Sequence, residues 1–164
     1  MVNKLLNTFM TLSLVITTVG IANLINAVAK AEDEPPMFAD ITIDRDFSPD
    51  PLKVRGMSGG SIPASQVNGG SKTQTGTCKG FVDKVPDHTL KLISKFDYLK
   101  LLIESPSDTT LMIKGPGGIW CNDDFDGKNP GIVGEWLKGD YQIWVGSYKK
   151  GKSLPYTLKI TEEK

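Results

Sequence analysis

The last third of the chain, from Asp108 to Ile160, constrains the fold more than any other part. Three short apolar runs, at residues 111–113, 141–145 and 156–160, are separated by clusters of Gly, Pro and Asp. Short apolar runs divided by turn residues are typical of strands in a small antiparallel β-sandwich. Gly and Pro are numerous, at 17 and 10 of 164 residues, which suits a loop-rich β protein. We therefore predict an all-β fold of this type.

Further strands are expected upstream of this region, at a spacing of about ten residues. Residues 98–103 are also compatible with one or two helical turns, because they include few β-branched residues. Residues 56–76 are rich in Gly, Ser, Thr and Gln, so we expect a long exposed loop or a partly disordered arm there. The expected strands begin near Ile41 and continue at 52–55, 89–93, 99–104, 111–114, 118–121, 141–147 and 156–161.

The first 31 residues predict a secretory signal peptide. Lys4 supplies a positive charge, residues 5–29 carry none, and small residues follow at signal-peptidase spacing at 27–29 or 29–31. The alternative is a permanent N-terminal anchor helix, but three asparagines dilute the apolar run. Cleavage predicts a secreted or periplasmic protein that has no membrane association afterwards.

Composition favours one domain with a single core behind this peptide. Hydrophobic residues make up 39% of the chain, enough for one core and not for several. We expect residues 32–77 to form a linker, the first strands and the Gly/Ser-rich loop, and residues 78–164 to form the main β-sandwich domain. The formal net charge is zero, so no strong field indicates nucleic acid as a partner.

Export makes the two cysteines informative. Cys78 and Cys121 are an even pair in an oxidising compartment, which predicts a disulfide. The bridge would close a loop of about 44 residues and contribute roughly 4 kcal/mol on a chain-entropy argument. The alternative is a metal pair, but with only His88 to help, the two cysteines lack the spacing of a zinc site.

A series of motifs resembles the bacterial pre-peptidase C-terminal domain. The family's pattern is followed in order by Asp108-Thr-Thr-Leu-Met-Ile, Gly115-Pro-Gly-Gly, Asn122-Asp-Asp, Gly139-Asp-Tyr-Gln-Ile-Trp-Val-Gly and Tyr156-Thr-Leu-Lys-Ile. The similar region covers about residues 90–161. Residues 46–60 and 78–88 resemble the front of a stand-alone, cyanobacterial-type variant of this domain.

This resemblance implies a small jelly-roll-like β-sandwich. Domains of the family are often appended to secreted proteases, and some relatives bind collagen, sugars or calcium. The sequence holds no protease domain, so the usual accessory role does not transfer directly. The resemblance is specific for the fold and weak for the ligand.

An acidic segment is the sharpest candidate for a metal site. Asn122, Asp124 and Asp126 are spaced by two and followed by Gly127, and Asp123 lies among them. Alternate oxygens on a tight turn can converge on calcium, as in the first half of a calcium loop. The second half of that template fails, because the position of its last ligand is the apolar Val133. The segment is thus either a weak calcium site or a solvated turn.

A second motif contains a possible nucleophile. Residues 56–60, Gly-Met-Ser-Gly-Gly, fit the G-x-S-x-G pattern around Ser58. A nucleophilic serine needs a base, and His88 is the only histidine in the chain. The expected strand–turn–helix context and large domain are missing. We therefore interpret the motif as a Gly/Ser loop, and His88 as a surface or capping residue.

Aromatic residues are concentrated in the C-terminal third. A small sandwich needs large side chains to fill its core, which is the simpler interpretation of most of them. We expect Trp120 to pack on the disulfide beside it. Trp144 and Tyr148 share a strand face, and if exposed they are candidates for contact with a ligand.

The sequence therefore favours a non-enzymatic β-sandwich module, secreted or periplasmic, with a structural or binding role. The first alternative is a calcium-assisted module that recognises an extracellular polysaccharide or protein. The second is a small serine hydrolase that uses Ser58 and His88.

Overall fold

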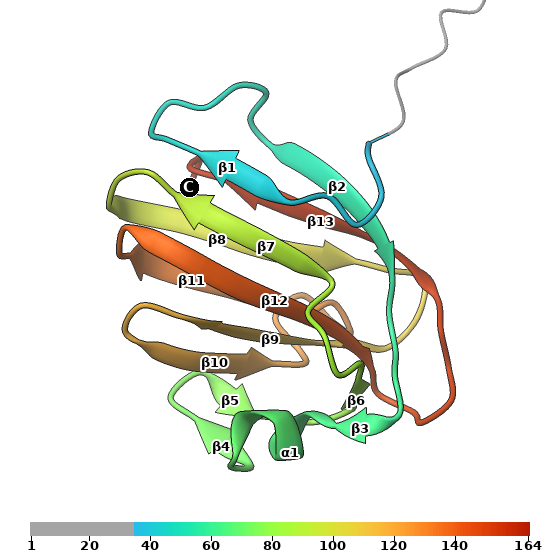
Figure 1. The fold of residues 1–164 in the computed structure, drawn as a ribbon. Helices are drawn as coiled ribbons and strands as arrows, with labels where there is room; N and C mark the ends of the chain where they lie inside the picture. The colour runs from blue at the N-terminus through green and yellow to red at the C-terminus, as the bar shows by residue number, and fades with distance from the viewer. Residues whose placement is uncertain (1–34) are drawn as a thin grey trace, which may run out of the picture. The chain divides into compact units, whose positions relative to one another are not determined.

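The computed structural model describes residues 35–164, so the predicted signal peptide lies outside the described residues. These residues belong to a compact unit, Asp33–Lys164, and the all-β prediction is confirmed (Figure 1). The elements are β1 (Ile41–Ile43), β2 (Leu52–Met57), β3 (Ile62–Pro63), α1 (Ala64–Asn68), β4 (Lys72–Thr73), β5 (Gly76–Thr77), β6 (Phe81–Val82), β7 (His88–Leu92), β8 (Phe96–Glu104), β9 (Thr109–Gly115), β10 (Gly118–Asn122), β11 (Gly131–Trp136), β12 (Gly139–Ser147) and β13 (Pro155–Thr161).

Two sheets form the layers of the sandwich. One has the order β11-β8-β13-β2, with antiparallel pairing throughout. The other is built around β12, which pairs with β7 on one side and with β9 on the other. β10 extends this second sheet beyond β9, and β1 extends it beyond β7 in parallel. The antiparallel sandwich is thus observed with one parallel pair.

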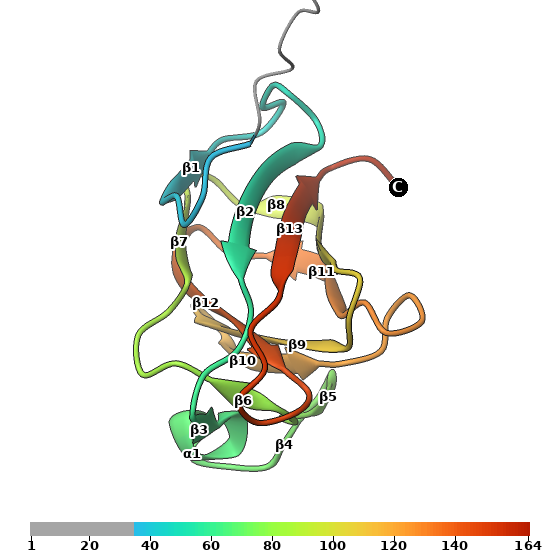
Figure 2. The same ribbon diagram turned by 90° about the vertical axis from the view of Figure 1, so that its right-hand side faces the viewer.

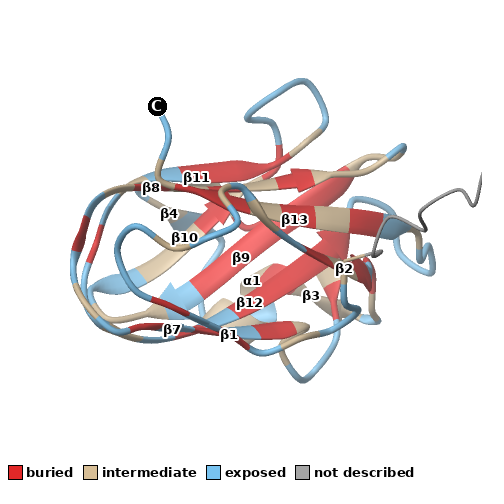
Figure 3. Ribbon diagram, turned by 90° about the horizontal axis from the view of Figure 1, so that it is seen from above, coloured by how far each residue is buried: buried red, intermediate tan, exposed pale blue. Residues whose placement is uncertain are grey.

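Alternation along the strands builds the main core between the sheets. On β12, Tyr141, Ile143 and Val145 face inward, which settles the face that the sequence left open. On β8, Leu99, Leu101 and Ile103 do the same from the opposite layer. Buried positions accordingly line the facing strands (Figure 3). Since β8 is a nine-residue strand, the helical alternative for residues 98–103 is wrong.

Residues 56–76 are not the exposed loop or disordered arm that the composition indicates. They contain the end of β2, the short helix α1 and three two-residue strands. Together with β6, the helix and these short strands lie beneath β9 and β10 (Figures 1 and 2). They enclose a second, smaller core on the outer face of the second sheet; its buried members are Ala64, Cys78, Val82, Met112, Cys121 and Trp144.

β11 is a strand that the sequence analysis did not list. It forms the edge of the first sheet and pairs with β8, with a register shift between Gly134 and Trp136. An Ile-Val pair and a Trp, bounded by Asn129-Pro130 and Lys138-Gly139, were the signal for it. Within residues 35–164, no helix is long and apolar enough to cross a bilayer.

Candidate functional site

The predicted disulfide is confirmed. Cys78 and Cys121 are bonded, with their Cα atoms 5.0 Å apart and both side chains buried. The bridge joins the chain entering β6 to β10 and lies in the small core. Asn68 in α1 donates from Nδ2 to Cys78 Sγ over 3.1 Å. The disulfide therefore fastens the segment of residues 64–80 to the second sheet.

Trp120 does not pack on this disulfide, contrary to expectation. Adjacent residues of a strand face opposite sides, so Cys121 enters the small core while Trp120 packs against the main core. There its ring centroid lies 6.0 Å from that of Trp136 and 6.3 Å from that of Tyr141. Trp136 Nε1 donates to Leu99 O and Tyr141 Oη to Leu137 O. The three rings form an aromatic cluster whose buried polar atoms are satisfied.

An apolar groove opens beside this aromatic cluster. It has a volume of about 400 Å³ and lies between the β9–β10 turn and β10 on one side and β11 on the other. Val133 and Leu137 on its β11 side are 40% and 50% exposed. The groove also includes Thr75, Ile132 and Glu135. Its walls are apolar, and one carboxylate stands at its rim.

The two strands that border the groove have differently protected edges. The edge of β10 is covered by the β4–β5 hairpin: the Cys121 N–H donates to the hydroxyls of Thr73 and Thr75, at 3.1 Å each, and Thr75 Oγ1 donates to Cys121 O. Such side-chain cover prevents the addition of a further strand.

The edge of β11 is open at one residue. The Ile103 N–H donates to Pro130 O, so antiparallel alternation directs the backbone groups of Gly131 and Val133 away from β8. Asn122 Oδ1 accepts the Gly131 N–H at 3.0 Å. Within the described strands β11 pairs with β8 alone, which leaves the N–H and C=O of Val133 at the free edge beside the groove.

The acidic loop has its predicted ligands engaged or turned outward. Asn122 Oδ1 caps Gly131, and Asp123 pairs with Lys79 Nζ at 2.7 Å. Asp124 and Asp126 are exposed. Among residues 35–164, no group of three His, Cys, Asp or Glu side chains could hold a metal ion. Weak calcium binding by this loop stays a prediction, which calcium-dependent melting would test.

Ser58 and His88 make separate contacts. Ser58 Oγ is buried and lies 3.0 Å from Ser147 Oγ. His88 is 1% exposed, which corrects its expected surface position, and burial lowers its pKa. Its Nδ1 faces Ala39 O at 3.0 Å and its Nε2 faces Tyr156 Oη at 2.8 Å. Both are structural contacts of a buried imidazole.

The glycines around Ser58 have a backbone role. Gly60 has a φ of 137°, and a Cβ there would lie 1.9 Å from the carbonyl carbon of Val82. At Gly59, with a φ of 126°, a Cβ would lie 2.3 Å from Lys152 O. The chain crosses between neighbouring segments at a distance that only glycine permits. The Gly-Gly of this motif is therefore explained by close packing.

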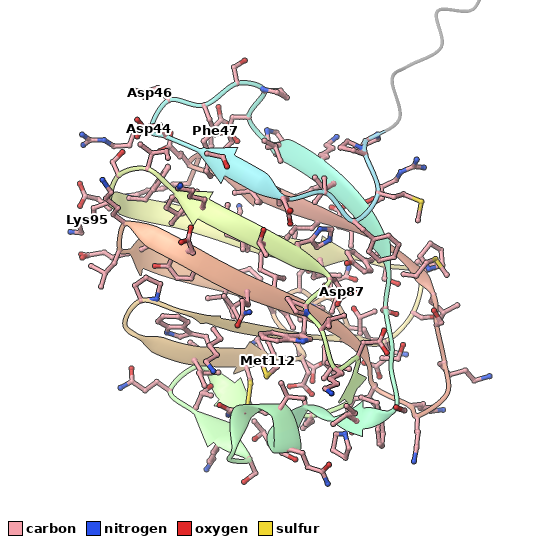
Figure 4. The ribbon with its side chains drawn as sticks, viewed as in Figure 1. Asp44, Asp46, Phe47, Asp87, Lys95 and Met112 are labelled. Atoms are coloured by element: carbon pink, nitrogen blue, oxygen red, sulfur yellow. A yellow bond between two sulfur atoms is a disulfide. The ribbon has the colours of Figure 1, made fainter. Side chains whose placement is uncertain are left out.

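Asp87 is a perturbed group that sequence reasoning missed. Its Oδ2 accepts the Val145 N–H at 2.7 Å, and burial raises its pKa to about 7, with a further contribution from Asp83. Figure 4 places Asp87 just before the start of β7, on the opposite side of the view from Asp44 and Lys95. No motif marked Asp87, because its burial depends on the pairing of distant strands.

The two aromatic residues offered as ligand contacts have different environments. Trp144 is 4% exposed and belongs to the small core, with Met112 as its β9 partner. Tyr148 follows the end of β12 and is 41% exposed, with Lys79 Nζ 5.7 Å from its ring centroid. The strand face that they share is therefore buried at Trp144 and exposed to solvent at Tyr148.

No protein-family model matches the chain. One relative is an uncharacterised protein of Synechococcus elongatus, 30% identical over 114 residues, which span 67% of this chain and 75% of that protein. The chain belongs to the same family as this protein. This relationship carries no activity over to the chain, so the function is argued from the site.

One solved structure is similar in fold to this chain. It is the pre-peptidase C-terminal domain of a collagenase from Bacillus anthracis, matched with a TM-score of 0.43 and 12% identity over 79% of this chain and 99% of that domain. It is the kind of domain that the sequence motifs resemble.

Proposed function

We propose that this protein is a secreted or periplasmic, non-enzymatic binding module that holds an extended segment of a partner protein at the groove between β10 and β11. The observation that carries the proposal is the open edge of β11 beside an apolar groove. An added strand would obtain backbone hydrogen bonds from the edge and side-chain contacts from the groove.

The backbone of β11 offers the directional part of this interaction. Val133 presents an N–H donor and a C=O acceptor to the groove side, between the capped Gly131 and the register shift at Gly134. An extended segment beside Val133 would satisfy both groups. Edge groups of this kind are usually protected, as they are on β10 by Thr73 and Thr75.

The groove offers the part that selects side chains. Every second residue of an added strand would point toward the aromatic cluster, and the exposed Val133 and Leu137 add apolar surface at the rim. The ring of Trp120 is the half-buried member of the cluster and is the ring we expect to contact such a residue. This favours apolar, alternating sequences in the partner.

Two observations support a non-enzymatic role outside the cytoplasm. A structural disulfide such as Cys78–Cys121 is typical of proteins from oxidising compartments. The imidazole of His88 is held by Ala39 and Tyr156, and the hydroxyl of Ser58 lies against Ser147. These contacts support structural roles for His88 and Ser58 rather than a Ser–His pair.

The experiment selects binders to the protein from displayed random heptapeptides. The affinity of each selected peptide is then measured for the wild type and for Val133→Pro. Proline on an edge strand removes only the outward N–H, so we expect affinity to fall by about threefold to tenfold, as for one lost hydrogen bond. Val133→Thr keeps the N–H and is the matched control. Trp120→Ala should weaken binding further.

Two results would count against the proposal. Selected peptides whose affinity is unchanged by both Val133→Pro and Trp120→Ala would place the site elsewhere. Failure to select any peptide, together with binding on a glycan array, would replace the protein partner by a polysaccharide. Retained melting temperatures of the variants show that the loss is local.

A further inference from the structure

We infer that this protein has a second binding site, a pocket on the outer face of the second sheet that takes a small organic carboxylate with an apolar body. The pocket has a volume of about 350 Å³ and shares none of its lining residues with the groove between β10 and β11. It does not depend on the proposed peptide function.

The position of the pocket follows from strand register. Trp144 pairs with Met112, and two residues earlier on the same face Gln142 pairs with Lys114. The first pair lies beneath the layer that contains α1, whereas Gln142 and Lys114 are exposed. Met112 lies on the side of the sheet that faces α1 (Figure 4). The pocket therefore opens where the small core ends and the uncovered face of the sheet begins.

The walls of the pocket are apolar. Val67 of α1, Val85 and Pro86 of the segment before β7, and Ile119 of β10 surround the pair formed by Trp144 and Met112. Val85 is among the most exposed large hydrophobic residues of the described chain. Walls of this kind favour an apolar ligand body, and the volume limits it to about the size of one ring or a branched alkyl group.

The polar groups of the pocket select an anion. Lys84 and Lys114 line it, and neither pairs with a carboxylate among residues 35–164. No Asp or Glu lines the pocket. A ligand carboxylate in contact with either ammonium group would form charge-assisted hydrogen bonds.

One residue that lines the pocket has a buried donor without a partner. Trp144 Nε1 is buried and has no hydrogen-bond acceptor in the described residues. The indole nitrogen only donates, and leaving a buried donor unpaired is unfavourable. A ligand carboxylate that reaches it would satisfy this donor, so the orphaned indole, the two lysines and the apolar walls indicate the same ligand chemistry.

The test is a titration followed by the indole N–H resonances of ¹⁵N-labelled protein. The chain has three tryptophans, and Trp144→Phe assigns the relevant signal. We expect 3-phenylpropanoate to shift the Trp144 indole signal saturably and to leave those of Trp120 and Trp136 in place. The neutral 3-phenylpropanamide, with the same body, should not shift it.

Charge variants complete the test. Lys84→Gln combined with Lys114→Gln should weaken 3-phenylpropanoate by at least about tenfold, since each lost charge-assisted bond is worth that order. Lys53→Gln combined with Lys128→Gln makes the same change in net charge away from the pocket and should have no effect. An unresponsive Trp144 indole, an equal response to the amide, or equal weakening by the control pair would overturn the inference.

Discussion

The main core and the small core of this protein are built in different ways. The main core lies between two sheets and consists of alternating residues from strands of up to nine residues. The small core has six buried members, gathered on the outer face of one sheet beneath a five-residue helix and strands of two residues. A disulfide crosses the small core, and none crosses the main one.

The difference explains why the small core is held by a covalent link and the main core is not. Each buried aliphatic side chain contributes roughly 1.5–3 kcal/mol, which must offset the ordering of every residue that forms the cluster. The main core meets this with strands that pair along their length. Residues 58–80 bury few side chains for their length, so the Cys78–Cys121 bridge and the hydroxyls of Thr73 and Thr75 hold them in place.

The largest effect is expected from a cavity in the main core. Leu101 is fully buried in the middle of β8, so Leu101→Ala should destabilise the protein by about 3–5 kcal/mol. Denaturant unfolding followed by intrinsic fluorescence measures this value. Val133→Ala, at an exposed position of the paired β11, should change stability by less than about 1 kcal/mol and serves as control. Similar losses of stability in both variants would contradict the distinction between a buried core position and an exposed strand position.

A somewhat smaller and more local effect is expected from the disulfide. Replacing Cys78 and Cys121 together by Ser should cost about 2–4 kcal/mol. Amide hydrogen exchange should accelerate most in α1, β4 and β5, which the bridge fastens, and least in β8 and β13. Uniform acceleration across all strands would show that the two cores unfold as one unit.

The main core could be predicted from the sequence because its signal is local. Alternation in Tyr141–Val145 and in residues 156–160 is visible within a few residues, and both segments are core strands. The small core could not be predicted in this way. Ala64 and Val82 are single apolar residues in a polar, Gly-rich stretch. They become buried only because they pack against the disulfide and Trp144, and Cys121 and Trp144 come from distant parts of the sequence.

The candidate sites were less predictable than the fold. Trp120 and Trp144 were both noticed as aromatics, but alternation assigned neither to a core. The groove depends on β11, which pairs with a strand some 30 residues away, and the pocket depends on α1, which composition concealed. The disulfide was predictable, because export and an even cysteine count need no tertiary information.

A titratable side chain, that of Asp87, lies at the junction between the main core and the small core, which we call the seam. Asp87 accepts the N–H of Val145, whose side chain is in the main core and whose neighbour Trp144 is in the small one. Burial raises the pKa of Asp87 to about 7, above its unfolded value. The folded protein then holds this proton more tightly, so the contribution of Asp87 to stability should fall as pH rises from about 4 to 7, by at most about 1.4 kcal/mol per pH unit.

Chemical denaturation at a series of pH values measures this slope. Asp87→Asn should flatten the fall between pH 4 and 7 and leave the protein more stable than wild type at pH 8. Exposed Asp83, which raises the pKa of Asp87, provides the control, since Asp83→Asn should reduce the slope only slightly. Equal pH slopes in the wild type and in Asp87→Asn would refute the raised pKa.

The smallest effect is expected where the chain passes from the main core to the small one. Ser58 follows β2, its N–H donates to Leu154 O, and its hydroxyl lies against that of Ser147. Ser58→Ala should cost about 0.5–1.5 kcal/mol, the usual net value of one hydrogen bond. Adding Ser147→Ala should cost less than a second such loss, because the partner is already missing.

The same variant separates a structural Ser58 from a nucleophilic one. Both hydroxyls are buried at the seam, with Gly59 and Gly60 packed against neighbouring backbone, so we expect Ser58 to be unreactive toward phosphonate probes. Any esterase activity of the purified protein should survive Ser58→Ala unchanged. Stoichiometric labelling of Ser58, or activity lost in a variant that keeps its fold, would mean that the seam opens to solvent. The boundary between the two cores would then be a reactive site rather than a packed junction.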